Sequence, residues 1–303
     1  MEVARLSERD PRWRGMSAAA SVEEWSGKDR TDENFPVGSC LIAARLRPAV
    51  HAFYAFARNA DDIADSATLA AEDKIARLDT MEAVLTGAQA AGSPSAAALR
   101  ASLAATGTTD RHARDLLVAF RQDATRRRYE TWDALLDYCR HSAMPVGRHV
   151  LDLHGEAHDT WPASDALCSV LQVLNHLQDA TNDLARLDRC YLPLDMLSAN
   201  HASVEDLRAR MATTGLRATF DALLDHCDAL MAGAPLPAFV RDRRLRLETA
   251  AIDGLARRLA RRLRRSDPIA RRVALTRPDF AASLIAAFTH FARPASSSPG
   301  AVT

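Results

Sequence analysis

The sequence of 303 residues lacks several features on which common functions depend. No uncharged apolar run approaches the roughly 18 residues that a bilayer-spanning helix needs. No GxGxxG or GxxxxGK(S/T) pattern is present, so a Rossmann or P-loop nucleotide site has no starting point. The five cysteines include no CxxC pair and are odd in number, which argues against a disulfide framework or a zinc knuckle.

An excess of charge of one sign is also missing. Lys+Arg and Asp+Glu each number 39, so the formal net charge is +0 and no overall field attracts nucleic acid. Arginine supplies nearly all the positive charge, because Lys28 and Lys74 are the only lysines. The first 15 residues are charged throughout and lack the apolar core of a signal peptide. We therefore expect a cytoplasmic protein that binds no nucleic acid.

The residues that are abundant indicate helices. Alanine and leucine dominate, and apolar positions recur at spacings of three and four. Breaks are expected near 87–94, 106–109, 155–164, 191–200 and 232–237, which leaves helices of roughly 12 to 25 residues between them. The sequence thus predicts an all-α protein with one domain at 16–292, between frayed ends at 1–15 and 293–303.

One predicted helix carries an acidic face. At about 100° per residue, Tyr54, Arg58, Asp61 and Asp65 fall within a narrow arc of this helix. Two carboxylates four residues apart disfavour a helix by about 0.2–0.5 kcal/mol. A role that requires both of them would explain their presence beside a guanidinium group.

A second predicted helix carries a matching face. Gln172, Asn175, His176, Asp179 and Asp183 share an arc of roughly 100°, while the neighbouring leucines turn elsewhere. If the two acidic faces meet inside a bundle, a cation must neutralise them. Mg²⁺ takes one or two carboxylates and fills its other positions with water and phosphate oxygens. The two faces together predict a magnesium site that holds a phosphorylated substrate.

Acidic pairs of this spacing usually lie in solvent, and the chain contains two such decoys. Asp133 with Asp137, and Asp221 with Asp225, have the same spacing but no polar neighbours on the same arc. Either acidic pair of the predicted site would be weak evidence alone. The combination of two pairs, each with polar neighbours, carries the prediction.

Basic segments offer partners for a phosphate or a membrane. The run of three arginines that includes Arg128 stands at the end of a predicted helix. The planar guanidinium group can donate two hydrogen bonds to a phosphate, so this run could bind one. The alternative is that these arginines form a solvent-exposed face of the helix. Further on, Leu255, Leu259 and Leu263 alternate with six arginines. Two interpretations stay open for this amphipathic helix: peripheral contact with an anionic membrane surface, or packing of the leucines on the bundle.

At the two acidic faces the sequence resembles the squalene/phytoene synthase family of prenyl synthases. The resemblance covers about residues 34–193 and includes Asp61-Asp62-Ile63-Ala64-Asp65, the second face followed by Arg189-Cys190-Tyr191-Leu192-Pro193, and the cleft-lining segment 138–147. It implies an all-α isoprenoid-synthase bundle with a central cleft between two aspartate-bearing helices. It also implies a prenyl diphosphate substrate and Mg²⁺ held by Asp61, Asp65, Asp179 and Asp183.

Segments 33–39, 45–48 and 142–147 resemble the branch of that family that makes hydroxysqualene in bacterial hopanoid biosynthesis. This branch ionises presqualene diphosphate, rearranges the cation and captures it with water. Its implied pathway partners are a presqualene diphosphate synthase and a flavoprotein that reduces hydroxysqualene. The sequence departs from the wider family at Glu33-Asn34-Phe35, at Gln178 and at Asn182.

The resemblance implies further roles around the cleft. Tyr54, Gln172 or Asn175 would position the water that captures the cation, with Tyr54 counted among the catalytic residues. The residues expected to contact the substrate are Arg58, Asn34, Phe35, Gln172, Asn175, Tyr138 and Arg128. The expected lining of the hydrocarbon tunnel consists of Phe35, Val37, Leu41, Phe53, Ala143, Val146 and Leu171.

Other functions stay open to different degrees. A condensing synthase, which makes presqualene diphosphate or phytoene, shares both aspartate motifs, and a non-catalytic helical interaction protein is the alternative outside enzymes. A class I terpene cyclase is disfavoured by Arg186 and Cys190, where its motif has Ser and Glu. A ferritin-like di-iron bundle is disfavoured because no histidine follows a glutamate by three residues.

Overall fold

The computed structural model describes residues 21–23 and 42–292. The predicted frayed ends at 1–15 and 293–303 lie outside the described residues. The helices of the described part are α1 (Arg47–Ala64), α2 (Ala71–Thr86), α3 (Pro94–Thr106), α4 (Arg111–Thr125), α5 (Trp132–Ser142), α6 (Met144–Leu153), α7 (Trp161–Leu187), α8 (Leu194–Ala199), α9 (Thr214–Leu230), α10 (Arg243–Arg265) and α11 (Arg277–Ala292). No strand occurs between residues 42 and 292, which confirms the predicted all-α class.

Local signals fix several helix ends. The Ser93 hydroxyl accepts a hydrogen bond from the Ala96 amide at the start of α3, and Gly107 ends that helix in the left-handed region at φ 67°. The Asp242 carboxylate caps α10 in the same way. The predicted breaks at 87–94 and 106–109 are confirmed. The break at 155–164 is shorter than predicted because α7 begins at Trp161.

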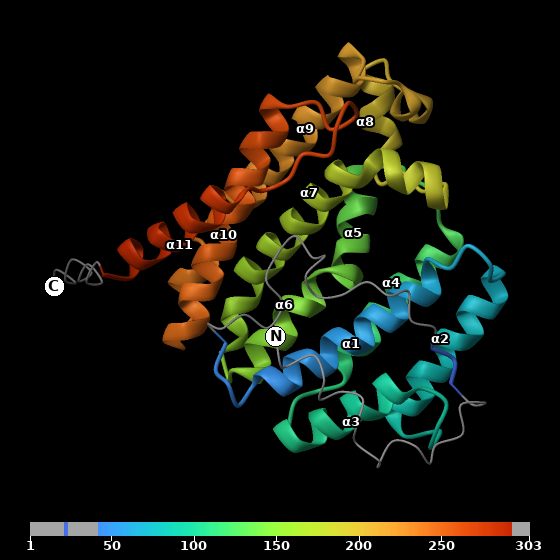
Figure 1. The fold of residues 1–303 in the computed structure, drawn as a ribbon, viewed down its shortest axis with the longest axis vertical. Coiled ribbons are helices and arrows are strands. Elements are labelled where there is room, and N and C mark those ends of the chain that lie inside the picture. Colours follow the sequence, from blue (N-terminus) through green and yellow to red (C-terminus); the bar gives the residue numbers. More distant parts are fainter. Residues whose placement is uncertain (1–20, 24–41, 293–303) are drawn as a thin grey trace, which may run out of the picture.

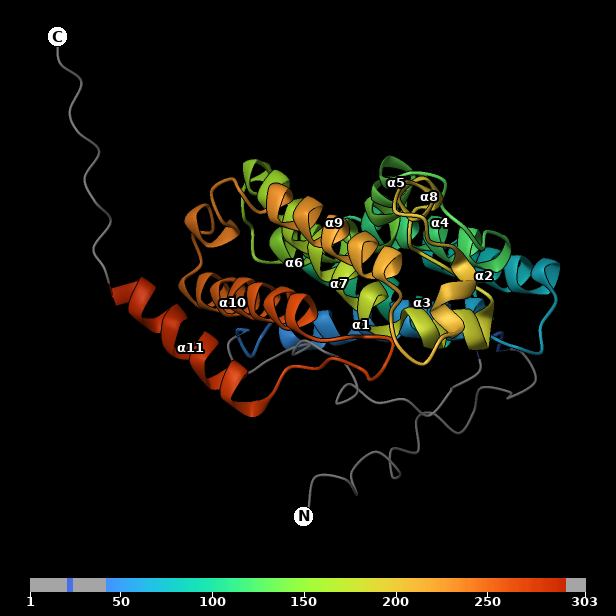
Figure 2. The ribbon, with the colours of Figure 1, turned by 90° about the horizontal axis from the view of Figure 1, so that it is seen from above.

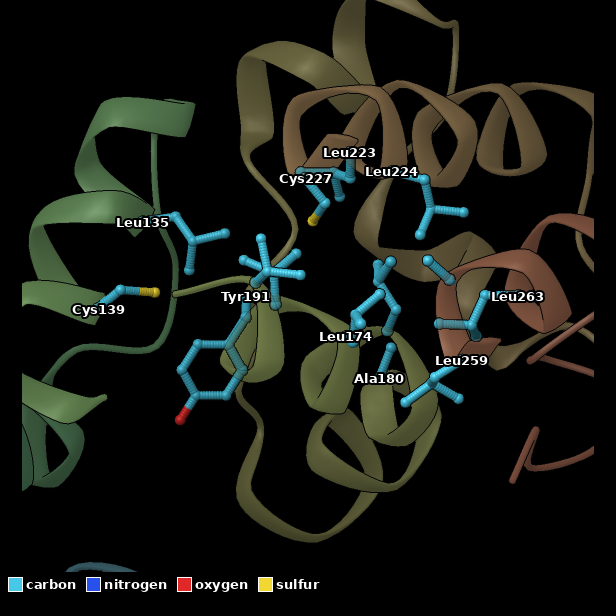
Figure 3. Close-up of a cluster of buried hydrophobic side chains, with 14 of the residues drawn as sticks. Leu135, Cys139, Leu174, Ala180, Tyr191, Leu223, Leu224, Cys227, Leu259 and Leu263 are labelled. Atoms are coloured by element: carbon cyan, nitrogen blue, oxygen red, sulfur yellow. The ribbon is translucent and has the colours of Figure 1, made fainter. Parts of the chain in front are cut away.

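The helices pack into two groups, and α7 belongs to the larger one (Figure 1). Apolar residues of α1, α2, α3 and α4 form one buried cluster, and α1 contributes Phe56 and Ile63 to it. A larger cluster joins α5, α7, α9 and α10 (Figure 3). In it α7 buries Leu174 and Leu177 on the face that turns away from its acidic residues. Burial of each such side chain contributes about 1.5–3 kcal/mol, so these clusters hold α1 and α7 in place.

The structure shows where the leucines of the leucine-arginine helix lie. Leu255, Leu259 and Leu263 of α10 are at most 2% exposed, and Leu259 and Leu263 belong to the larger cluster (Figure 3). Their packing on the bundle is therefore confirmed. Among the helices between residues 42 and 292, none is both long enough and apolar enough to cross a membrane.

Candidate active site

A cavity of about 430 Å³ lies among α1, α6, α7 and α10. Phe53, Val146 and Leu171, which the sequence predicts as tunnel lining, form part of its mostly apolar wall. Five predicted site residues also line it: Tyr54, Arg58, Asp61, Tyr138 and Gln172. On α1 the charged lining residues come after the apolar ones, and the acidic residues of α7 lie beyond its apolar lining. The cavity is thus an apolar pocket with a charged end.

Arg58 organises the acidic face of α1. Its guanidinium nitrogens lie 3.1 Å from Asp61 Oδ2 and 3.2 Å from Asp62 Oδ1. Asp65 follows directly after the last residue of α1. The surrounding protein, and then the Asp65 carboxylate, raise the pKa of Asp61 to about 8. Tyr54, Arg58 and Asp61 of the predicted arc thus line the cavity, and the carboxylates of Asp61 and Asp65 repel each other.

The acidic face of α7 lies at the same end. Asp179 accepts hydrogen bonds of 2.7 and 3.0 Å from Arg272, which lies in the loop between α10 and α11. Burial, then Asp179 and Asp65, raise the pKa of Asp183 to about 7. Because the Asp65 carboxylate, directly after α1, contributes to the raised pKa of Asp183 in α7, the acidic residues of the two helices lie near each other. The family resemblance implies such a cleft between two aspartate-bearing helices.

Between the acidic residues of α7 and the cavity, the same side of the helix carries neutral polar side chains. The Gln172 amide nitrogen lies 3.1 Å from His176 Nε2. The His176 ring stacks on Tyr191 with 3.6 Å between the ring centroids. Burial and then Arg189 lower the pKa of His176 to about 3, so this imidazole is neutral at pH 7. Gln172 lines the cavity, and Asn175 is half-buried one turn further along α7.

Two residues that the sequence patterns do not indicate as site residues complete the charged end of the cavity. Arg189, which is buried in the loop after α7, donates to the Asp65 carboxylate and to the carbonyl oxygens of Ala64 at 2.9 Å and Asp123 at 2.8 Å. Asp123 of α4 is buried and accepts the Tyr138 hydroxyl at 2.8 Å and the Tyr191 hydroxyl at 3.0 Å. Burial raises the pKa of Asp123 to about 6, against the opposing effect of Arg189.

A sequence signal for Asp123 existed. It continues the stripe of Leu116 and Ala119, two fully buried positions of α4, so an acid stands on the face that packs inward. Arg189 belongs to the segment that carries the family resemblance, although its contact with Asp65 is long-range. No local signal marked Arg272, because its partner is 93 residues away in the sequence.

The carboxylates fit a hard divalent cation by their chemistry. Burial raises the pKa values of Asp61, Asp123 and Asp183, and the Asp65 carboxylate adds to each of these three shifts, which indicates an excess of negative charge at this end. All four offer the oxygen ligands that Mg²⁺ takes. Within the described residues, however, no three His, Cys, Asp or Glu side chains converge as a metal site. Arg58, Arg189 and Arg272 hold three of the predicted ligands instead: Asp61, Asp65 and Asp179.

Other predicted site residues lie elsewhere. Arg128 pairs with the exposed Asp188 at 2.8 Å and is absent from the cavity wall, so its substrate contact stays a prediction. Ala143 is buried but does not line the cavity. Four predicted residues lie outside the described part of the chain: Asn34, Phe35, Val37 and Leu41.

Comparisons with known proteins agree with this architecture. The chain is 47% identical over 266 residues to the hydroxysqualene synthase of Rhodopseudomonas palustris, an alignment that covers 88% of this chain and 90% of that protein. It is 45% identical over 261 residues to the hydroxysqualene synthase of Zymomonas mobilis, across 85% of this chain and 86% of that one.

Solved structures show the same fold. The crystal structure of squalene synthase HpnC from Alicyclobacillus acidocaldarius superposes with a TM-score of 0.69 at 36% identity, and the match covers 78% of this chain and 90% of that chain. The profile of the squalene/phytoene synthase family matches residues 28–279. With both acidic faces at one end of an apolar cavity, the chain belongs to the squalene/phytoene synthase family of enzymes.

Proposed function

We propose that this enzyme converts presqualene diphosphate and water to hydroxysqualene and diphosphate. The observation that carries the proposal is the identity of 45–47% to hydroxysqualene synthases over most of the chain. The opposed acidic faces and the apolar cavity support it, because the substrate joins a diphosphate to a long hydrocarbon. Carbon–oxygen cleavage releases diphosphate, the resulting cation rearranges, and water adds to it with loss of one proton.

Asp61, Asp65, Asp179 and Asp183 would hold Mg²⁺, the group whose chemistry their oxygens fit. Bound Mg²⁺ would stabilise the charge of the departing diphosphate. For these carboxylates to reach a common ion, the side chains now held by Arg189 and Arg272 must turn away from them. Arg58, which lines the cavity beside Asp61, would donate hydrogen bonds to the diphosphate.

The cavity wall would control water. Phe53, Val146 and Leu171 surround the hydrocarbon and keep bulk solvent from the cation. Tyr54 and Gln172 line the same cavity and can place one water molecule against the cation. Asn175 is not among the residues that line the cavity. We therefore assign the positioning of the capturing water to Tyr54 or Gln172.

The proposed reaction also defines the neighbouring steps. An enzyme that makes presqualene diphosphate must supply the substrate, and a reductase, which we propose to be a flavoprotein, must consume hydroxysqualene. Both substrate and product carry long hydrocarbon chains that partition into membranes. We propose a cytoplasmic enzyme that works at the membrane surface.

Product analysis by gas chromatography–mass spectrometry tests the reaction. Purified protein with Mg²⁺ receives farnesyl diphosphate in one tube and presqualene diphosphate in another, without NADPH. Hydroxysqualene from the second tube alone is the expected result. Product from farnesyl diphosphate would instead make the protein a condensing synthase, and no product in either tube from folded protein would contradict the proposed substrate.

A further inference from the structure

Helix α11 presents its apolar side chains to the outside of the molecule. Phe280, Leu284, Ile285 and Phe288 are 40%, 38%, 64% and 52% exposed, respectively. At 100° per residue these four positions fall within one arc of about 140°. Figure 2 shows α11 at an edge of the molecule, alongside α10. Large apolar side chains of a surface helix normally face the core, so this orientation is reversed.

The opposite side of α11, which packs on α10, is small and polar. Asp279, Ser283 and Ala287 follow one another at a spacing of four and are buried. The guanidinium of Arg258 donates to Ser283 Oγ at 3.0 Å, and that of Arg262 donates to Asp279 Oδ2 at 2.8 Å. These hydrogen bonds fix the rotation of α11 about its axis. The apolar face therefore cannot turn inward without breaking them.

The same region carries an excess of positive charge. Residues 255–292 contain nine arginines and two aspartates, although the whole chain is neutral. Arg261, Arg265, Arg271 and Arg277 are exposed and form no ion pair within the part of the chain that the structure describes. Arg277 lies within the arc of the apolar face, at the first position of α11.

Two of these arginines border the start of α11. Arg261 and Arg265 line a hollow that also includes Asp279, the residue before Phe280. An apolar stripe flanked by arginines is the pattern of helices that lie in the interface of an anionic membrane. The apolar side chains enter the acyl boundary, and the guanidinium groups meet the lipid phosphates.

We propose that the face formed by Phe280, Leu284, Ile285 and Phe288, with Arg261, Arg265 and Arg277 at its border, docks the enzyme on an anionic lipid bilayer. The excess of positive charge within residues 255–292 selects this occupant over a second copy of the chain. A two-fold dimer through this face would bring both sets of arginines together. Residues 293–303 contain no acidic residue.

Vesicle flotation of the full chain tests the docking face independently of the reaction. The vesicles contain equal parts of phosphatidylcholine and phosphatidylglycerol, and pure phosphatidylcholine vesicles give the comparison. We expect the wild type to float with the anionic vesicles. The double variant Ile285→Glu/Phe288→Glu should reduce the bound fraction at least ~10-fold. Met211→Glu, which alters a side chain 66% exposed elsewhere, should bind as the wild type does.

The arginines are tested by charge removal. Arg261→Gln/Arg265→Gln/Arg277→Gln should reduce binding at least ~10-fold, since each juxtamembrane arginine adds to the attraction. The matched control Arg111→Gln/Arg140→Gln/Arg210→Gln removes the same charge from other exposed positions and should retain binding. Turnover of detergent-dispersed substrate should be unchanged in all these variants, because none lies in the cavity.

Three outcomes would overturn the proposal. The first is wild-type protein that fails to float with anionic vesicles. The second is binding that survives both the apolar and the arginine substitutions. The third is a wild-type dimer in size-exclusion chromatography with light scattering that Ile285→Glu/Phe288→Glu converts to a monomer, which would assign the face to a second copy.

Discussion

Arg189 and Asp65 form an ion pair although 124 residues separate them in the sequence. The same guanidinium donates to the carbonyl oxygens of Ala64 and Asp123, which lie near the C-terminal ends of α1 and α4. A single buried cation thus joins α1, α4 and the loop after α7. It supplies positive charge among carboxylates that otherwise repel one another.

We expect Arg189→Gln to lower the free energy of unfolding by about 2–3 kcal/mol at neutral pH. Loss of one partner of a buried pair costs about 3–5 kcal/mol, and the 30% exposure of the Asp65 side chain reduces that cost. Urea denaturation of the wild type and the variant measures this loss of unfolding free energy. Arg128→Gln, which breaks an exposed pair with Asp188, is the control and should cost less than about 1 kcal/mol. Equal losses in the two variants would show that Arg189 has no special structural role.

Asp179→Asn tests the second acidic face. We expect turnover of presqualene diphosphate to fall at least ~100-fold, because a missing ligand removes several kcal/mol of charge stabilisation by the metal. The Mg²⁺ concentration for half-maximal activity should rise in parallel. Steady-state kinetics with titrated MgCl₂ measures both, and circular dichroism should show an unchanged fold.

Asp133→Asn is the matched control for that experiment. Asp133 and Asp137 have the spacing of a site pair, but Asp133 lies in the first turn of α5 and lines no part of the cavity. Wild-type kinetics are expected. A comparable loss in Asp133→Asn would mean that spacing alone, rather than position at the cleft, accounts for the effect of Asp179→Asn.

The sequence could predict those features that depend on local periodicity. A face such as Arg58, Asp61 and Asp65 follows from helix geometry alone, since positions three and four apart always lie together. The opposition of this face to Asp179 and Asp183 required the resemblance to a known family as well. The fold class followed from composition and spacing.

The remaining features depend on tertiary contacts that no local pattern records. Arg272 reaches Asp179 from a loop 93 residues away, and the fold alone places it there. Helix α8 has six residues, too few for a periodic signal, and so the segment 191–200 was predicted as a break. The outward face of α11 was missed because periodicity identifies an apolar side without telling which way it turns.

Gly147 allows α6 and α7 to approach each other at the cavity wall. A Cβ atom there would lie 2.3 Å from Ser164 Oγ and 2.6 Å from Cys168 Sγ. We expect Gly147→Ala to lower the free energy of unfolding by about 1–3 kcal/mol through overpacking, and to reduce turnover because both neighbours line the cavity. Urea denaturation and kinetics measure the two effects.

Two companion variants separate overpacking from loss of glycine flexibility. Adding Ser164→Ala and Cys168→Ala to Gly147→Ala removes both clashing atoms and should recover part of the lost stability. Gly233→Ala is the control, because a Cβ there meets no described atom within 4 Å. If the triple variant were no more stable than Gly147→Ala, the close helix approach would not be the cause.

His149 should make the protein sensitive to acid. Its side chain is 1% exposed and stacks on Phe53 with 3.9 Å between ring centroids, and neither ring nitrogen has a hydrogen-bond partner among the described residues. Burial, and then His112, lower the pKa of His149 to about 3. The unfolded chain, with a pKa near 6.5, binds more protons between these values, so stability rises with pH across that window and falls as pH decreases.

His149→Phe keeps a ring against Phe53 and removes the titrating group. Between pH 7 and 5 the wild type should lose about 2 kcal/mol of unfolding free energy through this histidine, and the variant should not. The variant should also be more stable at pH 7, since it buries no unsatisfied nitrogen. His226→Phe makes the same substitution at an exposed ring stacked on Trp132 and serves as the matched control. Denaturation at a series of pH values decides: parallel curves for wild type and His149→Phe would show that His149 does not cause the acid sensitivity.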